Sequence, residues 1–436
     1  MKKVLNAKIF SLLFILSLTV SLAGCGAREN SNAAAANPTK DQTAATLVSA
    51  PEQDAAEPAI AAAPDGSVYV VWVEHLPQKR ADVYIRRYDA DQKPLGEAVR
   101  VNPEKGVATA WRGDQPTIET TSDGNVYIGW TARVETADGA ANDLFLSVSR
   151  DRGATFDAPV KVNDDKIAAD RGMHSLEIDK TGRIYFAWLD ERYLKTAAAP
   201  EKPPESNRDA AKHEHAEPNR EVYLAVSSDN GKTFAANKKI AANACPCCKT
   251  SLTIAPDGRL YIAWRQVLDG DFRHIAVSSS IDGGNSFAPP SIVSDDRWQI
   301  NACPVSGAGL AVDSKNVLTV VWFTAGQAGT PGIYTARSTD GGATFSPRAL
   351  IGENIADGTP VLIDDPAKNS RFAVLSAGKT VSALTAQNSS ADFKEQSRIN
   401  DAELPGAALS KDRLYVAFVR RNGEKRNVMF LSKHLN

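Results

Sequence analysis

The feature that most constrains this chain is a repeated phrase of a tight turn, an aromatic and β-branched strand, and a tryptophan. Its copies end at five tryptophans, Trp72, Trp130, Trp188, Trp264 and Trp322. Successive tryptophans are 58, 58, 76 and 58 residues apart. Asp-Gly between two short apolar runs, as at Asp65-Gly66, is a strong hairpin signal. A fixed period of this size predicts that one small β-unit is repeated along the chain.

A second repeat runs in phase with the first. Four turns share the pattern Ser-x-Asp-x-Gly-x-x-Phe, and their aspartates are Asp151, Asp229, Asp282 and Asp340. This pattern resembles the Asp box, or BNR repeat, of the sialidase-like β-propellers, and the resemblance covers residues 57–436. In such a turn the carboxylate accepts backbone N–H groups, the glycine takes a positive φ, and the phenylalanine packs between sheets. We therefore interpret the four aspartates as structural, and not as catalytic acids or calcium ligands.

Together the repeats predict a four-stranded antiparallel meander of about 50–58 residues, the size of a propeller blade. Seven units begin near residues 57, 115, 173, 249, 305, 358 and 405. The last unit stops after its third strand, and residues 46–49 can supply the missing outer strand, which removes an exposed edge. We expect an all-β propeller over 45–436 with seven blades, closed by an N-terminal strand. Six blades is the alternative, since sialidases of the resembling family have six.

The N-terminal residues are predicted to be processing and anchoring signals. An apolar stretch at 9–22 follows a basic start, and Leu22-Ala23-Gly24-Cys25 resembles the lipobox of bacterial lipoproteins, whose cysteine is lipidated. Residues 1–24 are then a signal peptide, and 25–44 form a flexible tether. This resemblance implies an extracytoplasmic protein that a lipid on Cys25 holds to a membrane. Gly26 replaces the Asp that retains such lipoproteins at the inner membrane, which favours the outer one.

Charge and cysteine content exclude several classes. The 50 basic and 52 acidic side chains nearly balance, which is not typical of a polycationic nucleic-acid binder, so no nucleic-acid partner is expected. The five cysteines are too few to form the scaffold of a 436-residue disulfide-rich protein.

Cysteines gather where the repeat predicts one rim of the propeller channel. In an antiparallel meander, residues before strand one, after the tryptophan, and at the start of strand three share a face. Cys245, Cys247 and Cys248 precede the first strand of unit four, and Cys303 occupies the equivalent place in unit five. His174 lies in the matching run of unit three. We expect these five residues to lie close together.

Three interpretations of the cysteines remain open. Disulfides such as Cys245–Cys303 are common outside the cytoplasm, but they leave two neighbouring cysteines that only a strained bridge could join. A metal site with His174 or Met173 would favour copper(I) or zinc, although Cys-x-Cys-Cys is tighter than the usual zinc spacing. A redox-active thiol is the third.

The resemblance also implies a sialidase site, which the sequence matches poorly. Family sialidases bind the substrate carboxylate with three arginines and use a Tyr–Glu nucleophile pair and an Asp acid/base. The region that corresponds to the first arginine, 50–58, has none. Arg112, Arg192 and Arg265 are possible replacements, and acidic candidates follow Trp188, namely Asp190 and Glu191. No catalytic residue is carried over from the family.

Our leading hypothesis is a non-hydrolytic propeller whose rim binds a small molecule, a glycan or a metal ion, with copper before zinc. The alternatives are an exo-α-sialidase and a surface adhesion or assembly platform. His213 and His215, in a long insertion at roughly 194–219, are interpreted as part of a solvated loop.

Overall fold

The structure is a computed structural model that describes residues 44–435 apart from 110, 112, 137–138, 197–217, 301–303, 354–357 and 389. The described residues belong to one compact unit, Pro38–Asn436. Several predictions fall outside them: the signal peptide, Cys25 with most of its tether, Arg112, His213, His215 and Cys303. Among the described helices, none has the length and apolar character needed to cross a membrane.

The described strands form five four-stranded sheets and one eight-stranded sheet, with antiparallel pairing throughout. The first sheet contains β2 (Asp54–Ala62), β3 (Val68–Leu76), β4 (Arg80–Tyr88) and β5 (Val99–Arg100), with a short 3-10 helix at Pro77–Lys79. The second contains β6 (Thr117–Thr120), β7 (Val126–Thr136), β8 (Gly139–Ser149) and β9 (Val160–Lys161).

The eight-stranded sheet consists of two four-stranded groups. The first is β10 (Arg171–Ile178), β11 (Ile184–Asp190), β12 (Arg220–Ser227) and β13 (Lys238–Ala244), with α1 (Arg192–Thr196) after β11. The second is β14 (Ser251–Ile254), β15 (Leu260–Leu268), β16 (Phe272–Ser280) and β17 (Ser291–Ile292). The groups join at the residue pair Ala244↔Gln266, between β13 and β15.

Three more sheets complete the chain. They contain β18 (Ala308–Val312), β19 (Leu318–Thr324), β20 (Gly332–Ser338) and β21 (Ala349–Gly352), then β22 (Val361–Asp365), β23 (Ser370–Ala377), β24 (Thr380–Gln387) and β25 (Lys394–Asn400). The last has β26 (Glu403–Ser410), β27 (Arg413–Asn422) and β28 (Lys425–His434). Its fourth strand is β1 (Thr46–Leu47), which pairs with β28 at Thr46↔Phe430, as the sequence predicted.

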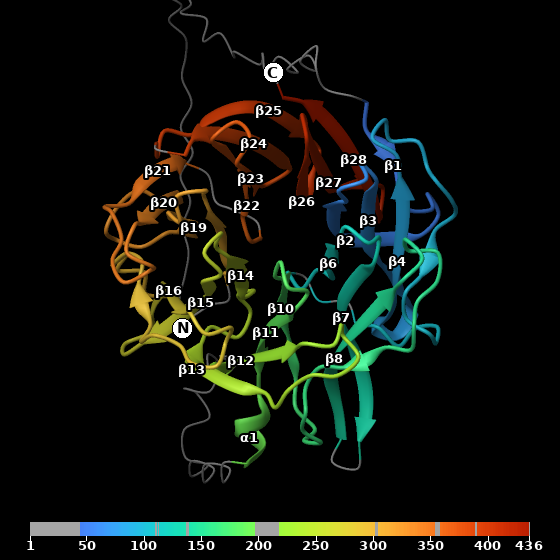
Figure 1. Cartoon of the computed structure of the whole chain (residues 1–436), viewed down its shortest axis with the longest axis horizontal. Coiled ribbons are helices and arrows are strands. Elements are labelled where there is room, and N and C mark those ends of the chain that lie inside the picture. Colours follow the sequence, from blue (N-terminus) through green and yellow to red (C-terminus); the bar gives the residue numbers. More distant parts are fainter. Residues whose placement is uncertain are drawn as a thin grey trace, which may run out of the picture. The chain divides into compact units, whose positions relative to one another are not determined.

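The sheets are arranged around a common centre (Figure 1). Their first strands contact one another in a cyclic order, β2, β6, β10, β14, β18, β22, β26 and β2 again. The middle strands are buried on both faces because neighbouring sheets pack against each side. Val71 of β3, for example, shares a buried cluster with Trp130 of β7. This explains why the repeated strands are continuous apolar runs and not alternating ones.

The four Asp boxes form one repeated hydrogen-bonded turn. In the second, Asp229 accepts hydrogen bonds from Ser227 Oγ (2.8 Å), Thr233 N (3.0 Å) and Thr233 Oγ1 (2.6 Å). Gly231 has φ of 80°, and a Cβ there would lie 2.8 Å from Leu146 Cδ2. Phe234 packs against the buried cluster that contains Trp188. The same carboxylate contacts recur at Asp151, Asp282 and Asp340.

Candidate functional site: a buried cysteine cluster

The cysteine motif forms the turn that joins the two halves of the eight-stranded sheet. It follows Ala244, the last residue of β13, and precedes β14. Cys248 N donates to Cys245 O (3.4 Å), so the four residues form a β-turn with Pro246 at its second position, where a fixed φ is favourable. Cys245 N donates to Arg265 O (2.8 Å) and ties the turn to β15. The turn therefore holds the three cysteines in a small space.

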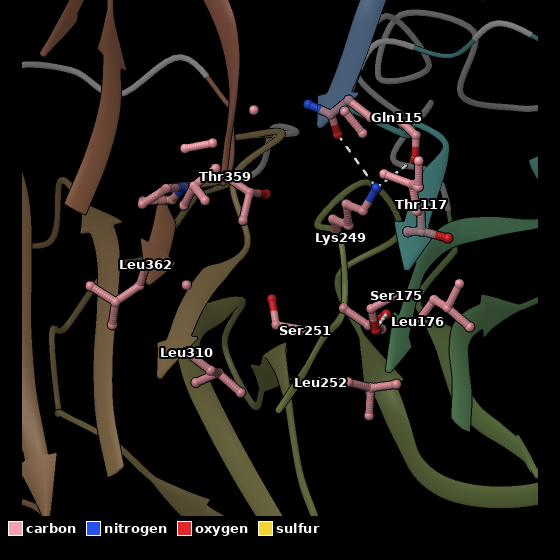
Figure 2. Close-up of a pocket in the computed structure, with 18 of the residues that line it drawn as sticks. Gln115, Thr117, Ser175, Leu176, Lys249, Ser251, Leu252, Leu310, Thr359 and Leu362 are labelled. Atoms are coloured by element: carbon pink, nitrogen blue, oxygen red, sulfur yellow. Dashed lines mark hydrogen bonds between the residues drawn. The ribbon is translucent and has the colours of Figure 1, made fainter. Parts of the chain in front are cut away.

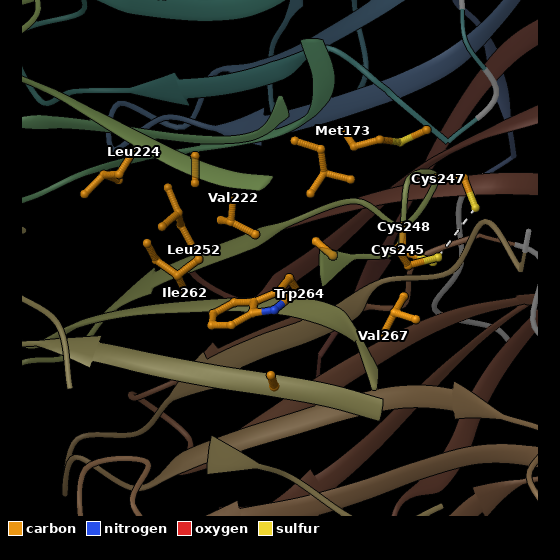
Figure 3. Close-up of a cluster of buried hydrophobic side chains, with 14 of the residues drawn as sticks. Met173, Val222, Leu224, Cys245, Cys247, Cys248, Leu252, Ile262, Trp264 and Val267 are labelled. Atoms are coloured by element: carbon orange, nitrogen blue, oxygen red, sulfur yellow. Dashed lines mark hydrogen bonds between the residues drawn. The ribbon is translucent and has the colours of Figure 1, made fainter. Parts of the chain in front are cut away.

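The three sulfurs face one another in the core (Figure 3). Cys248 Sγ lies 3.2 Å from Cys245 Sγ, Cys247 Sγ lies 3.9 Å from Cys245 Sγ, and all three ligand atoms are within 4.8 Å of one another. No cysteine of the turn is more than 4% exposed. Met173, Trp264 and Val267 belong to the same buried cluster. The predicted rim cluster is thus a core cluster.

Oxidation state differs within the turn. Cys245 and Cys248 are free thiols. Cys247 is disulfide-bonded, and its partner lies outside the described residues. Because Cys245 is free, the Cys245–Cys303 disulfide, which was one example among the three open interpretations, is not formed in this structure.

Two arginines supply positive charge to the cluster. Arg273 Nη1 of β16 donates to Cys245 Sγ (3.1 Å). Arg265 is completely buried; its Nε and Nη2 donate to Ser306 O (3.1 and 2.9 Å), whereas its Nη1 has no hydrogen-bond partner. The contact between Arg273 and Cys245 was not predicted from the sequence.

These contacts shift the pKa values of the two free thiols in opposite directions. The hydrogen bond from Cys248 lowers the pKa of Cys245 to about 6 against the effect of burial, and the charges of Arg273 and Arg265 assist. Burial, followed by the hydrogen bond to Cys245, raises the pKa of Cys248 well above its usual value. The arrangement is that of a thiolate at Cys245 next to a protonated thiol at Cys248.

His174 is not part of this sulfur group. Its Nδ1 lies 3.0 Å from Asp114 Oδ1, and its ring stacks on Phe186 with centroids 5.3 Å apart. Burial raises the pKa of Asp114, but the charges of His174 and Lys249 outweigh it and the pKa is lowered overall. The group of close ligand atoms in the described residues consists of the three cysteines, so a ligand role for His174 stays a prediction.

The residues proposed for a sialidase-like site are used within the fold. Arg192 donates from Nε to Asp190 Oδ2 (3.0 Å) and from Nη1 to Asp164 Oδ1 (2.9 Å). Glu191 accepts from Arg220 Nε (2.7 Å). Arg265 is the buried arginine beside the cysteines. Arg192 and Asp190 form one ion pair and Glu191 pairs with Arg220, whereas Arg265 donates to backbone carbonyls.

A cavity of about 270 Å³ lies among the first strands of all the sheets. Its lining includes Lys249, whose Nζ donates to Gln115 O (2.7 Å; Figure 2). Glu119 and Glu177 also line it. Burial raises the pKa of Glu119 to about 8; burial, then the charge of Glu119, raises that of Glu177.

The two glutamates are not among the candidate residues predicted from the sequence. They are 58 residues apart, which is the tryptophan period, and this spacing is the signal that could have found them. Burial lowers the pKa of Lys249 to about 8, and Asp114 partly offsets the effect.

Comparison with known proteins concerns the fold. No family model and no curated protein matches the chain. An ulvan lyase of polysaccharide lyase family PL25, solved bound to -[GlcA(1-4)Rha3S]-, is 11% identical with a TM-score of 0.54, covering 89% of this chain and 95% of that one. Polysaccharide lyase Uly1 is 12% identical with a TM-score of 0.53, covering 93% and 94%.

The NanB sialidase from Streptococcus pneumoniae is 12% identical with a TM-score of 0.48, covering 85% of this chain and 84% of that one. The two polysaccharide lyases, whose TM-scores exceed 0.5, show that this chain shares their fold. At this identity the similarity does not extend to activity.

Proposed function

We propose that this chain binds a soft metal ion, copper(I), through Cys245, Cys248 and Cys247. The observation that supports it is the group of three buried sulfurs whose ligand atoms are within 4.8 Å of one another. Thiolates select copper(I) over hard cations, and a structural zinc site needs four ligands, which this group lacks with His174 held by Asp114. The third ligand, Cys247, becomes available when its disulfide is reduced.

The surroundings fit such an ion. A thiol must lose its proton to bind a metal, and the arginine contacts favour the thiolate at Cys245. The apolar shell around the turn keeps water away, which protects a copper(I) thiolate centre. Bound copper would supply no reaction by itself; the function proposed is storage or transfer of the ion.

The test is elemental analysis of protein purified and loaded under reducing conditions. We expect copper in near one-to-one ratio with the wild type, and a large loss in Cys248→Ala and Cys247→Ala. Asn230→Ala, in the turn of an Asp box, is the matched control and should bind as the wild type does. The absence of copper and zinc from the wild type, or unchanged affinity in Cys247→Ala, would disprove the proposal.

We infer a seven-bladed ring in which the eight-stranded sheet is two adjoining blades. The cyclic contacts of seven first strands and the two four-stranded groups joined at one residue pair support it. The pairing of β1 with β28 would then close the ring. An experimental structure that shows six repeats of density around the axis would contradict this count.

We further propose that a lipid on Cys25 anchors the protein outside the cytoplasm, in the outer membrane of a two-membrane cell. The lipobox-like Leu22-Ala23-Gly24-Cys25 supports it. Metabolic labelling with a fatty-acid analogue should mark the wild type and not Cys25→Ala, and membrane fractionation should place the label in the outer membrane. An unlabelled wild type would refute the anchor.

A second candidate function is binding or cleavage of an anionic glycan in the cavity among the first strands. Lys249 offers an ammonium group there, paired glutamates with raised pKa values suit acid/base work, and the structurally similar proteins include ulvan lyases and sialidases. The test is turnover of a fluorogenic sialoside and of ulvan. Turnover that Glu119→Gln abolishes would support it, and inertness on both would end it.

A further inference from the structure

We propose that Cys245 and Cys248 form a site of reversible oxidation, in which peroxide converts Cys245 to a sulfenic acid and Cys248 closes a disulfide. This inference goes beyond metal binding and does not depend on it. It concerns the two free thiols of the motif Cys245-Pro246-Cys247-Cys248, which have Cys-x-x-Cys spacing.

The geometry assigns different roles to the two sulfurs. Cys245 Sγ accepts hydrogen bonds from Cys248 Sγ (3.2 Å) and from Arg273 Nη1 (3.1 Å). Of the two free thiols, Cys245 is the one that the guanidinium of Arg273 contacts, and a neighbouring cation favours attack by a cysteine sulfur on an oxidant. Cys248 is the donor of that sulfur pair, and its sulfur lies close enough to attack Cys245 in the second step. Cys245 is therefore the attacking sulfur and Cys248 the resolving one.

Burial decides which oxidant can act. Cys245 is 1% exposed and Cys248 is fully covered, so a protein disulfide cannot approach either sulfur. Hydrogen peroxide is neutral and only slightly larger than water, so small openings of the turn admit it. A buried cysteine is ordinarily inert, and the guanidinium of Arg273 distinguishes this one.

The chemistry balances without a further reactant. The Cys245 thiolate attacks one peroxide oxygen, the O–O bond breaks, and hydroxide leaves with Cys245 as a sulfenic acid. Cys248 then attacks the Cys245 sulfur, the S–O bond breaks, and the second hydroxide, taking up the proton of Cys248, leaves as water. The two thiols lose two electrons, which peroxide gains. The sulfurs need to approach by only about 1 Å to reach disulfide bond length.

The experiment uses reduced, metal-free full-length protein with the Cys247→Ala substitution, so that the existing disulfide cannot re-form. One equivalent of hydrogen peroxide should remove two alkylatable thiols, which tandem mass spectrometry should assign to a Cys245–Cys248 bridge. Dithiothreitol should restore both. Retention of both thiols, or a bridge that omits either residue, would overturn the inference.

Single variants test the roles. In Cys248→Ala, a cyclic 1,3-dione should trap a sulfenic acid at Cys245, whereas Cys248 of Cys245→Ala should stay unmodified at the same peroxide concentration. Arg273→Met should slow oxidation by at least about tenfold, and Arg273→Lys should recover part of the rate. Equal reactivity of the two single-cysteine variants would overturn the assignment.

Metal and redox outcomes can be told apart. If the bridge forms but reduced wild-type protein takes up no copper, the proposed function fails and this inference stands. If copper binds but no bridge forms, the reverse holds. If both hold, the bridge should prevent copper loading until dithiothreitol is added, because it consumes two of the three sulfur ligands.

Discussion

The Asp-box turns and the cysteine turn are both tight connections, but their side chains differ in where their hydrogen-bond partners come from. Within the part of the chain that the structure describes, the hydrogen bonds that Asp229 accepts come from its own turn, and the one from the Thr233 side chain, assisted by others, lowers its pKa to about 2. Cys245 instead contacts Arg273 from a distant strand, and the neighbouring Arg265 keeps an unpartnered Nη1. The comparison indicates that a side chain whose hydrogen bonds all come from its own turn has a structural role. A side chain that contacts residues of distant strands, and whose neighbours keep unpaired donors, is available for chemistry.

The largest expected effect comes from removing one sulfur of the cysteine turn. Cys248→Ala should weaken copper(I) binding by at least about 100-fold, since one of the three thiolate ligands is lost. Competition with a chromogenic copper(I) chelator measures the affinity. Asp229→Ala should leave that affinity unchanged, and equal losses in both variants would mean that the effect comes from misfolding.

Arg265→Met should destabilise the fold by about 3 kcal/mol or more, because the carbonyls of Ser306 and Phe323 lose charge-assisted donors in the core. Urea denaturation followed by tryptophan fluorescence measures the free energy of unfolding. Arg398→Met, which removes an exposed ion pair with Glu395, is the control and should change it little. A neutral Arg265→Met would show that this guanidinium is dispensable for folding.

Glu119→Gln should stabilise the protein at high pH and not at low pH. The folded pKa is raised to about 8 from 4.5, so the unfolded chain ionises first and wild-type stability falls as pH rises between these values. The gain should be on the order of 1–3 kcal/mol at pH 9 and near zero at pH 4. Chemical denaturation across pH measures it, and a gain of equal size at pH 4 would contradict the burial argument.

The smallest effect belongs to the Asp box. Asp229→Ala should cost about 1 kcal/mol, since the turn is exposed and water replaces part of the lost hydrogen bonding. Thermal unfolding measures the change. The amide of Asp229→Asn keeps one acceptor oxygen, so its stability should lie between that of Asp229→Ala and that of the wild type. A larger loss of stability in Asp229→Asn than in Asp229→Ala would contradict this expectation.

Much of the fold could be predicted because its signals are local and repeated. The tryptophans, the Asp boxes and the strand that completes the last sheet lie where periodicity placed them. The site was harder, since periodicity gives the place of a residue along a unit and not its partner. It brought three cysteines together, but it could not show that Asp114 holds His174 or that Arg273 contacts Cys245. The Asp114–His174 contact joins neighbouring units and the Arg273–Cys245 contact joins a turn to a strand of the same sheet, so both depend on side-chain packing.

The pairing of β1 with β28 has a mechanical consequence. The first described strand is joined to the last by the pairs Thr46↔Phe430 and Leu47↔Met429, with a further hydrogen bond from Val48 N to Val428 O (2.9 Å). Any tension that reaches Thr46 from the preceding chain is thus borne by these few bonds before it reaches the rest of the body. A force applied on the N-terminal side of β1 therefore acts first on the hydrogen bonds between β1 and β28.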